Sequence, residues 1–192
     1  AITDHGAMFG AIDFYKACKA NDIKPIIGCE VYVAPRNRKD KDPNLDAKYN
    51  HLILLAKDNQ GYKNLATLVS LGYTEGFYYK PRIDREILEK YHEGLICLSA
   101  CLAGEINQNL LNGREEEAER VALWHKELFG EDYYIEIQNN GIQEQVLANQ
   151  KLIKLARKLD IPIVATNDAH YLRREDAYNH EVLLCIQTGK RM

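Results

Sequence analysis

The sequence lacks a long apolar run and an excess of positive charge. Its longest apolar stretches are only long enough for strands, which excludes a helix that spans a membrane. The 25 Lys and Arg residues are outnumbered by 28 Asp and Glu residues, which gives a formal net charge of −3. A domain that coats duplex DNA is usually strongly basic, so this charge argues against a protein that grips DNA with its whole surface.

The sequence also lacks a paired cysteine motif. Its five cysteines are scattered along the chain and include no CxxC pair. Their odd number and their spacing argue against a disulfide framework and against a zinc ribbon. Unpaired cysteines of this kind are typical of a reducing compartment, so we expect a cytoplasmic protein.

No Pro-, Gly- or Ser-rich linker, internal repeat or low-complexity tract divides the 192 residues. With 46 % apolar and 28 % charged residues, the composition predicts one folded domain over residues 1–192. The chain begins at Ala1 rather than Met, in an apolar run typical of the end of a strand, and carries no signal peptide. We therefore expect a piece of a longer protein whose first strand lies upstream, with residues from about 181 beginning the connection to a next domain.

Short apolar runs alternate with helical periodicity along the chain. Strands are expected at residues 1–3, 26–33, 51–56, 94–99, 133–138 and 162–166. Helices are expected at residues 8–20, 61–71, 83–91, 103–111, 115–129, 143–159 and 175–187, and residues 35–48 form a charged loop. Repeated strand–helix units predict parallel strands covered by helices, so the expected class is α/β, as a barrel or an open doubly wound sheet.

Side chains that bind metals recur at or near the ends of the expected strands. They are Asp4 and His5 after the first strand, Glu30 within the second, His51 at the start of the third, Cys101 after the fourth, and Asp168 and His170 after the last. Because strand ends converge on one face of a parallel barrel, residues far apart in sequence can meet there. Histidines, carboxylates and one thiolate together suit Zn²⁺, Mn²⁺ or Fe²⁺.

Each of these residues alone also has a simpler interpretation. Asp4 could shape a turn, His51 could be a satisfied core histidine, and Cys101 could be a small buried apolar side chain. Glu30 is harder to explain in this way, because a carboxylate inside an apolar strand needs a cation or hydrogen bonds. The coincidence of all these residues near strand ends favours a shared metal site.

The sequence also predicts the orientation or exposure of several other polar side chains. Asp168 and His170 lie two apart, and side chains with that spacing on an extended segment face the same way. Glu136 lies in an expected strand and faces inward, as a ligand or as an acceptor for a metal-bound histidine. His92 and His125 lie among charged residues and are expected to be solvated.

Two segments carry clustered cations. Residues 36–41 (RNRKDK) are locally basic, and Lys80 and Arg82 follow the pair Tyr78-Tyr79. Aromatic side chains next to cations suit single-stranded nucleic acid. A solvated surface with tyrosines packed on lysine stems explains the same pattern, so no nucleic-acid-binding residue is assigned.

Several blocks of the sequence together resemble the polymerase-and-histidinol-phosphatase (PHP) family. They are ITDHG at residues 2–6, PIIGCE at 25–30, HLILLAKDNQGYKNL at 51–65, LSACLAGE at 98–105 and TNDAHYL at 166–172. More narrowly, they are similar to the PHP domain at the N-terminus of bacterial replicative polymerases of the DNA polymerase III alpha-subunit type. The gram-positive polymerase type carries an exonuclease inserted in this domain, and no insertion interrupts this chain.

The resemblance implies a distorted (βα)7 barrel with two to three divalent metal ions at one end, Zn, Mn or Fe, with Mg as a further option. Its first strand, with an HxH pair, is absent from this chain, so at least one ion should be held weakly. The metal ligands that the resemblance implies are His5, Glu30, His51, Cys101, Asp168 and His170. Of these, His5, Asp168 and His170 are the expected catalytic residues, while Asp4 and Glu136 are candidates for supporting the ligands.

The chemistry that the resemblance implies is metal-dependent phosphoester hydrolysis within a DNA-directed DNA polymerase. Its substrate would be the 3′ end of a mispaired primer strand, in 3′→5′ proofreading. The implied partners of the whole polymerase are DNA, a proofreading exonuclease subunit and a sliding clamp, and no membrane. Two alternatives stay open: a non-catalytic domain that stabilises the polymerase and docks a separate exonuclease, and a small-molecule phosphatase.

Overall fold

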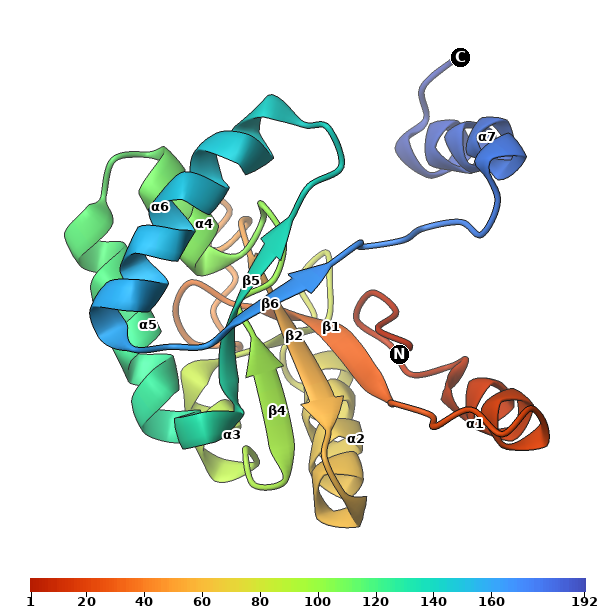
Figure 1. The fold of residues 1–192 in the computed structure, drawn as a ribbon, viewed down its shortest axis with the longest axis horizontal. Coiled ribbons are helices and arrows are strands. Elements are labelled where there is room, and N and C mark those ends of the chain that lie inside the picture. Colours follow the sequence, from red (N-terminus) through yellow and green to blue (C-terminus); the bar gives the residue numbers. More distant parts are fainter.

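A computed structural model describes residues 1–192 as a mixed six-stranded sheet covered by helices (Figure 1). The strands are β1 Gly28–Val33, β2 Asn50–Ala56, β3 Arg82–Ile83, β4 Leu95–Leu98, β5 Tyr133–Gln138 and β6 Ile163–Thr166. The helices are α1 Ala11–Ala20, α2 Asn59–Thr74, α3 Arg85–Lys90, α4 Glu105–Leu111, α5 Glu115–Phe129, α6 Gln143–Leu159 and α7 Ala177–Thr188, with short 3-10 turns η1 Gly130–Asp132 and η2 Arg174–Asp176. The predicted α/β class is confirmed.

The strands follow the order β3-β1-β2-β4-β5-β6 across the sheet. β1 is parallel to β3, β4 is parallel to β5, and β5 is parallel to β6. β2 instead runs antiparallel to both of its neighbours, so the prediction of an all-parallel sheet is wrong for this strand. The reason is the connection: a parallel pair needs a crossover, usually a helix, and the loop from β1 to β2 contains none.

The sheet does not close on itself, because its edge strands β3 and β6 do not pair with each other. Residues 2–5 run alongside β1, where Ile2 and His5 form parallel bridges with Ile27 and Glu30. This open sheet is consistent with the distorted barrel that the resemblance implies.

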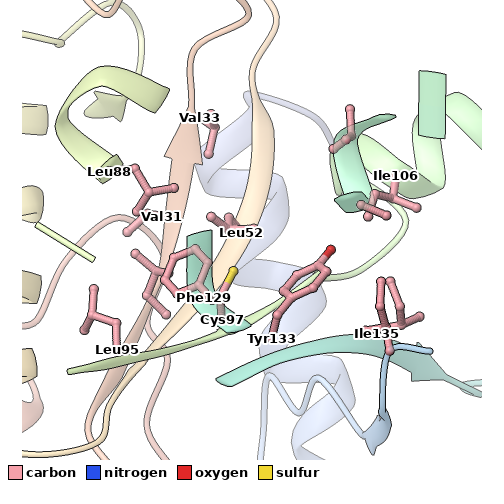
Figure 2. Packing of buried hydrophobic residues seen from close by; sticks show 14 of the residues in the cluster. Val31, Val33, Leu52, Leu88, Leu95, Cys97, Ile106, Phe129, Tyr133 and Ile135 are labelled. Carbon is pink, nitrogen blue, oxygen red and sulfur yellow. The ribbon is translucent and has the colours of Figure 1, made fainter. Parts of the chain in front are cut away.

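The main core lies between the sheet and helices α2 to α6 (Figure 2). It contains 24 buried residues, among them Leu65 of α2 and Tyr133 of β5. α5 contributes Ala118, Val121 and Ala122, whose three- and four-residue spacing places them on one face of that helix. Packing of these helices therefore fixes one face of the sheet.

The opposite face of the sheet carries a smaller apolar cluster. Ile53, Leu98 and Ala100 are buried there, and Tyr134 and Val164 pack against them. Four of these side chains line a cavity of about 830 Å³. The second face of the sheet is therefore the floor of the cavity.

Local signals fix where α2 and α3 begin. The Asp58 carboxylate accepts a hydrogen bond from Gly61 N at 2.8 Å, and the Asp84 carboxylate accepts one from Ile87 N at 3.2 Å. Gly61 also has no room for a side chain, because a Cβ there would lie 1.8 Å from the carbonyl oxygen of Gly94. The first turn of α2 thus packs directly on the backbone before β4.

The expectation that His125 is solvated is wrong. Its side chain is buried in the core, stacked on Tyr133 at 5.2 Å between ring centroids. Burial lowers the pKa of His125 to about 4, so the ring is neutral at physiological pH. His92 is half-buried, and its Nδ1 lies 2.7 Å from the carbonyl oxygen of Glu89.

Helices α1 and α7 stand apart from this core, at the margin of the molecule (Figure 1). α7 buries none of its residues, and Leu183 and Ile186 are exposed on it. Neither these helices nor the others combine the length and apolar character needed to cross a membrane.

Candidate metal centre

Glu30 is the centre of a cluster of polar side chains at one end of the sheet. It lies in the middle of β1 and is only 3 % exposed. Its Oε1 lies 2.5 Å from Nδ1 of His5 and 2.9 Å from Nδ1 of His51. Burial alone would raise the pKa of Glu30, but the bonds to the two histidines outweigh it and lower the pKa to about 2. The carboxylate is therefore held in its charged form.

His5 reaches Glu30 because its segment runs along β1. Asp4 O accepts a hydrogen bond from Glu30 N at 3.1 Å, and Gly6 N donates to Glu30 O at 2.8 Å. The hydrogen bond with Glu30 raises the pKa of His5. The other ring nitrogen of His5, Nε2, lies 3.2 Å from Nε2 of His170.

His51 and Cys101 complete the buried side of the cluster. His51 N donates to Ala103 O at 3.0 Å, which ties the start of β2 to the turn that carries Cys101. Cys101 Sγ lies 3.6 Å from His51 Nδ1, and burial raises the pKa of this thiol to about 11. One ligand atom each from Glu30, His51 and Cys101 all lie within 4.8 Å of one another. A carboxylate, an imidazole and a thiol form a donor set that suits Zn²⁺ and similar divalent ions.

Asp168 and His170 follow β6 but not on an extended segment. Asp168 has φ of +49°, in the left-handed region, so the expectation of an extended pair is wrong. The ring of His170 turns back, with Nδ1 2.8 Å from the carbonyl oxygen of Asp168 and 3.8 Å from its carboxylate Oδ1. This turn directs Nε2 of His170 toward His5.

The structure thus brings the six predicted ligands into one connected group. His5, Glu30, Asp168 and His170 line the 830 Å³ cavity, whereas His51 and Cys101 are not among its lining residues and contact the cluster through Glu30 and through each other. Their binding of a metal stays a prediction.

The two residues expected to support the ligands are placed differently. Glu136 is buried in β5, and its Oε1 accepts hydrogen bonds from Gln138 Nε2 at 3.0 Å and from the Thr166 hydroxyl. Its Oε2 has no partner, and burial raises its pKa. No histidine bonds to Glu136 in the structure, and Asp4 supports the site through its backbone carbonyl group.

Sequence reasoning missed two aromatic residues beside His51. The ring of Tyr49 is stacked on that of His51, with 6.0 Å between centroids and 4° between planes. Tyr32 packs edge-on against His51 at 5.3 Å. The position of Tyr32, two residues after Glu30 on the same strand, was the signal that could have identified it.

The basic segment at residues 36–41 is largely neutralised within the fold. Arg36 pairs with Asp46 at 2.6 Å, and Arg38 is buried and pairs with Glu75 at 2.7 Å. Arg82, expected on the surface, is fully buried. Arg38 and Arg82 therefore hold the loop together from within the fold, whereas Lys39 and Lys41 are exposed.

Comparison with known proteins identifies the family. The PHP domain family profile matches residues 1–140. DNA polymerase III subunit alpha of Borreliella burgdorferi is 50 % identical over 192 residues, covering 100 % of this chain and 17 % of that protein. The same subunit of Thermus aquaticus is 53 % identical over 190 residues, covering 98 % of this chain and 16 % of that protein.

The chain spans about a sixth of the length of these relatives, which is 16–17 %. The stretch matched by the profile includes His5, Glu30, His51 and Cys101, while Asp168 and His170 follow it. Since that stretch covers well over half of the 192 residues, the chain belongs to the PHP domain family.

Proposed function

We propose that this chain is the PHP domain of a bacterial DNA polymerase III alpha subunit and that it hydrolyses phosphodiester bonds at the 3′ end of DNA. The observation that carries the proposal is the convergence of Glu30, His51 and Cys101 within 4.8 Å, beside an open cavity. The whole protein, in the bacterial cytoplasm, would be a DNA-directed DNA polymerase that acts in DNA replication, with other replicase subunits as partners. Residues 1–192 would be one domain, with the residues from about 181 leading to the next.

The residues of the cluster fit divalent metal ions. Glu30 supplies a buried charge, His51 an imidazole nitrogen and Cys101 a thiol, while His5, Asp168 and His170 present further donors on the cavity side. Two to three ions of Zn, Mn, Fe or Mg would be held by these residues. When bound, such ions supply an activated water and neutralise charge on the phosphoryl oxygens.

Side chains that face the cavity would bind and orient the substrate. We assign catalytic roles to His5, Asp168 and His170, which lie where a phosphodiester entering the cavity would meet the cluster. The Nε2 atoms of the two histidines, 3.2 Å apart, point at each other and would orient the phosphoryl group between them and the cavity floor. Glu30 fixes the His5 ring through the 2.5 Å bond to Nδ1, which directs Nε2 toward His170.

A second candidate is a non-catalytic role. Exposed apolar side chains on α7, such as Leu183 and Ile186, favour a surface that other parts of a replicase cover. In this role the metals would only stabilise the domain, and a separate proofreading exonuclease would dock on the polymerase.

The test uses the intact polymerase subunit and a 5′-labelled primer with a mismatched 3′ end. We expect metal-dependent shortening of the primer from its 3′ end, lowered about a hundredfold or more by Asp168→Asn. Asp160→Asn is the matched control, because Asp160 is exposed at the end of α6 and has a left-handed backbone that Asn accepts. DNA synthesis by each variant checks its folding.

Two outcomes would decide against the nuclease. Unchanged shortening in Asp168→Asn would remove Asp168 from the mechanism and point to a contaminating nuclease. No shortening under any metal, combined with a lower melting temperature after chelation, would favour the non-catalytic role.

A further inference from the structure

Residues 78–80 form a tight turn with an aromatic side chain at its tip. Tyr78 N donates to Lys80 O at 3.1 Å across the turn, and Tyr79 between them has φ of +60°. A bulky side chain is rarely found in this left-handed region, and such outliers concentrate at functional sites. Tyr79 is nevertheless 67 % exposed. Packing of the side chain in the core therefore does not explain why a tyrosine occupies this left-handed position.

The base of this turn is rigid. The Arg82 side chain is fully buried and donates to the backbone oxygens of Gly76 at 3.1 Å and of Asp46 at 2.9 Å. Its guanidinium group lies 5.1 Å from the ring centroid of Tyr78, whose ring is 4.5 Å from that of Tyr79. The exposed ring of Tyr79 therefore packs on Tyr78, which is itself held by the buried Arg82.

Lys80 adds a free cation to the turn. It forms no ion pair, whereas Arg36, Arg38 and Lys39 each pair with a carboxylate. Its Nζ lies 5.7 Å from the centroid of the Tyr32 ring. Lys80 is thus a cation whose charge is available to an anionic ligand.

Tyr32 connects this turn to the metal centre. Its ring packs edge-on against His51 at 5.3 Å. A Cβ built on Gly6, which directly follows one of the candidate ligands, would lie 2.7 Å from Tyr32 Cε2 and 3.1 Å from Pro81 Cγ. The turn is therefore next to Tyr32, which contacts His51, and to Gly6, which follows His5.

We propose that Tyr79 and Lys80 form a subsite for single-stranded DNA that leads its 3′ end to the metal centre. The Tyr79 ring stacks on a base, and the Lys80 ammonium binds a backbone phosphate. Stacking accepts any base and the phosphate contact is independent of sequence, as a nuclease acting on any primer requires. This subsite rests on the proposed function and narrows its substrate to polynucleotides with an unpaired end.

The test compares two substrates with the intact polymerase subunit. One is a single-stranded oligonucleotide, and the other is bis(p-nitrophenyl) phosphate, which has neither a base nor a second phosphate. Tyr79→Gly removes the ring and places glycine where φ is +60°, so the turn keeps its conformation. Tyr79→Phe keeps the ring, and Lys80→Ala removes the charge.

We expect Tyr79→Gly and Lys80→Ala each to raise KM for the oligonucleotide about tenfold. Tyr79→Phe should stay near the wild-type KM, and both Tyr79 variants should hydrolyse the small diester at the wild-type rate. Tyr15→Ala and Lys63→Ala are the matched controls, since Tyr15 is exposed on α1 and Lys63 is exposed on α2, both outside the turn. An unchanged oligonucleotide KM in Tyr79→Gly would overturn the subsite.

A second measurement is independent of turnover. An oligonucleotide with 5-iodouracil near its 3′ end is irradiated with the same protein, and the linked peptide is identified by mass spectrometry. A cross-link at Tyr79 supports the subsite, and cross-links elsewhere alone overturn it. If neither substrate is hydrolysed, the proposed function fails, and the cross-link still decides whether the turn binds DNA.

Discussion

Glu30 and His51 lie on neighbouring antiparallel strands, with Nδ1 of the histidine 2.9 Å from Oε1 of the glutamate. In the register of this pair, Glu30 is opposite Ile53 and His51 is opposite Tyr32, so the two side chains meet diagonally on one face of the sheet. Because β2 is antiparallel to β1, its first residues pair with the last residues of β1, Tyr32 and Val33, two to three positions beyond Glu30. The strand that departs from the expected topology therefore assembles the candidate metal centre.

Glu30→Gln should lower the affinity for metal at least tenfold, because it removes the buried charge that faces two histidines. The pKa of His5 should fall toward its ordinary value, since the bond to Glu30 is what raises it. Metal content by mass spectrometry and an NMR titration of the histidines measure the two effects. Glu116→Gln, on the exposed face of α5, is the control, and equal metal content in both variants would exclude Glu30 as a ligand.

Stability of the metal-free domain should depend on pH through the same pair. The pKa of Glu30 is lowered from 4.5 to about 2. Its contribution to the free energy of unfolding is therefore present above pH 4.5 and is lost as the pH falls toward 2. The pKa of His5 is raised from 6.5, so its contribution is complete below pH 6.5 and is lost as the pH rises through the raised value. The pair should therefore stabilise most between pH 4.5 and 6.5.

Thermal unfolding of the chelated protein from acid to alkaline pH measures this dependence. The difference in melting temperature between wild type and Glu30→Gln should be largest inside that window. A difference that stays constant across the range would show that the pair does not couple to folding.

Cys101→Ser should change which metal is preferred. A thiolate favours Zn²⁺, whereas a hydroxyl is a harder and weaker ligand, so zinc affinity should fall at least tenfold while Mn²⁺ and Mg²⁺ binding changes less. Competition between these metals in equilibrium dialysis measures the change. Cys185→Ser on α7 is the matched control, and a zinc affinity equal to that control would remove Cys101 from the site.

Arg82→Met should loosen the loop between β1 and β2. Arg82 donates to four backbone oxygens, at Arg38, Asp40, Asp46 and Gly76. Loss of these partners leaves buried carbonyl groups unpaired, at a cost of about 3 kcal/mol in the free energy of unfolding. Hydrogen exchange of residues 35–49 should accelerate, and the same rates in Arg82→Met as in the exposed control Arg157→Met would contradict this role.

Much of the fold was predictable because periodicity reports local burial. The bounds of α5, β5 and α6 agree with the predicted ranges. The two-residue strand β3 was missed, since Arg82–Ile83 is too short to show a pattern. His125 was misread as solvated although it lies four residues from both Val121 and Phe129, on the buried face of α5. The spacing of His125 from these apolar residues indicates its burial better than its charged sequence neighbours do.

The candidate ligands were predictable as a set, but not their geometry. Burial of Glu30 follows from its apolar strand, and the structure supplies two histidines as its partners. The left-handed turn at Asp168 and the antiparallel approach of His51 depend on tertiary contacts that spacing does not encode. The burial of Arg82 was equally hidden, because its partners are backbone oxygens of a distant loop.

The most direct test of the metal centre is an anomalous-scattering map from crystals of the intact subunit grown with Zn²⁺. We predict a peak within about 2.0–2.3 Å of ligand atoms of Glu30, His51 and Cys101. A fully loaded crystal whose peaks all lie away from these three side chains would contradict the account.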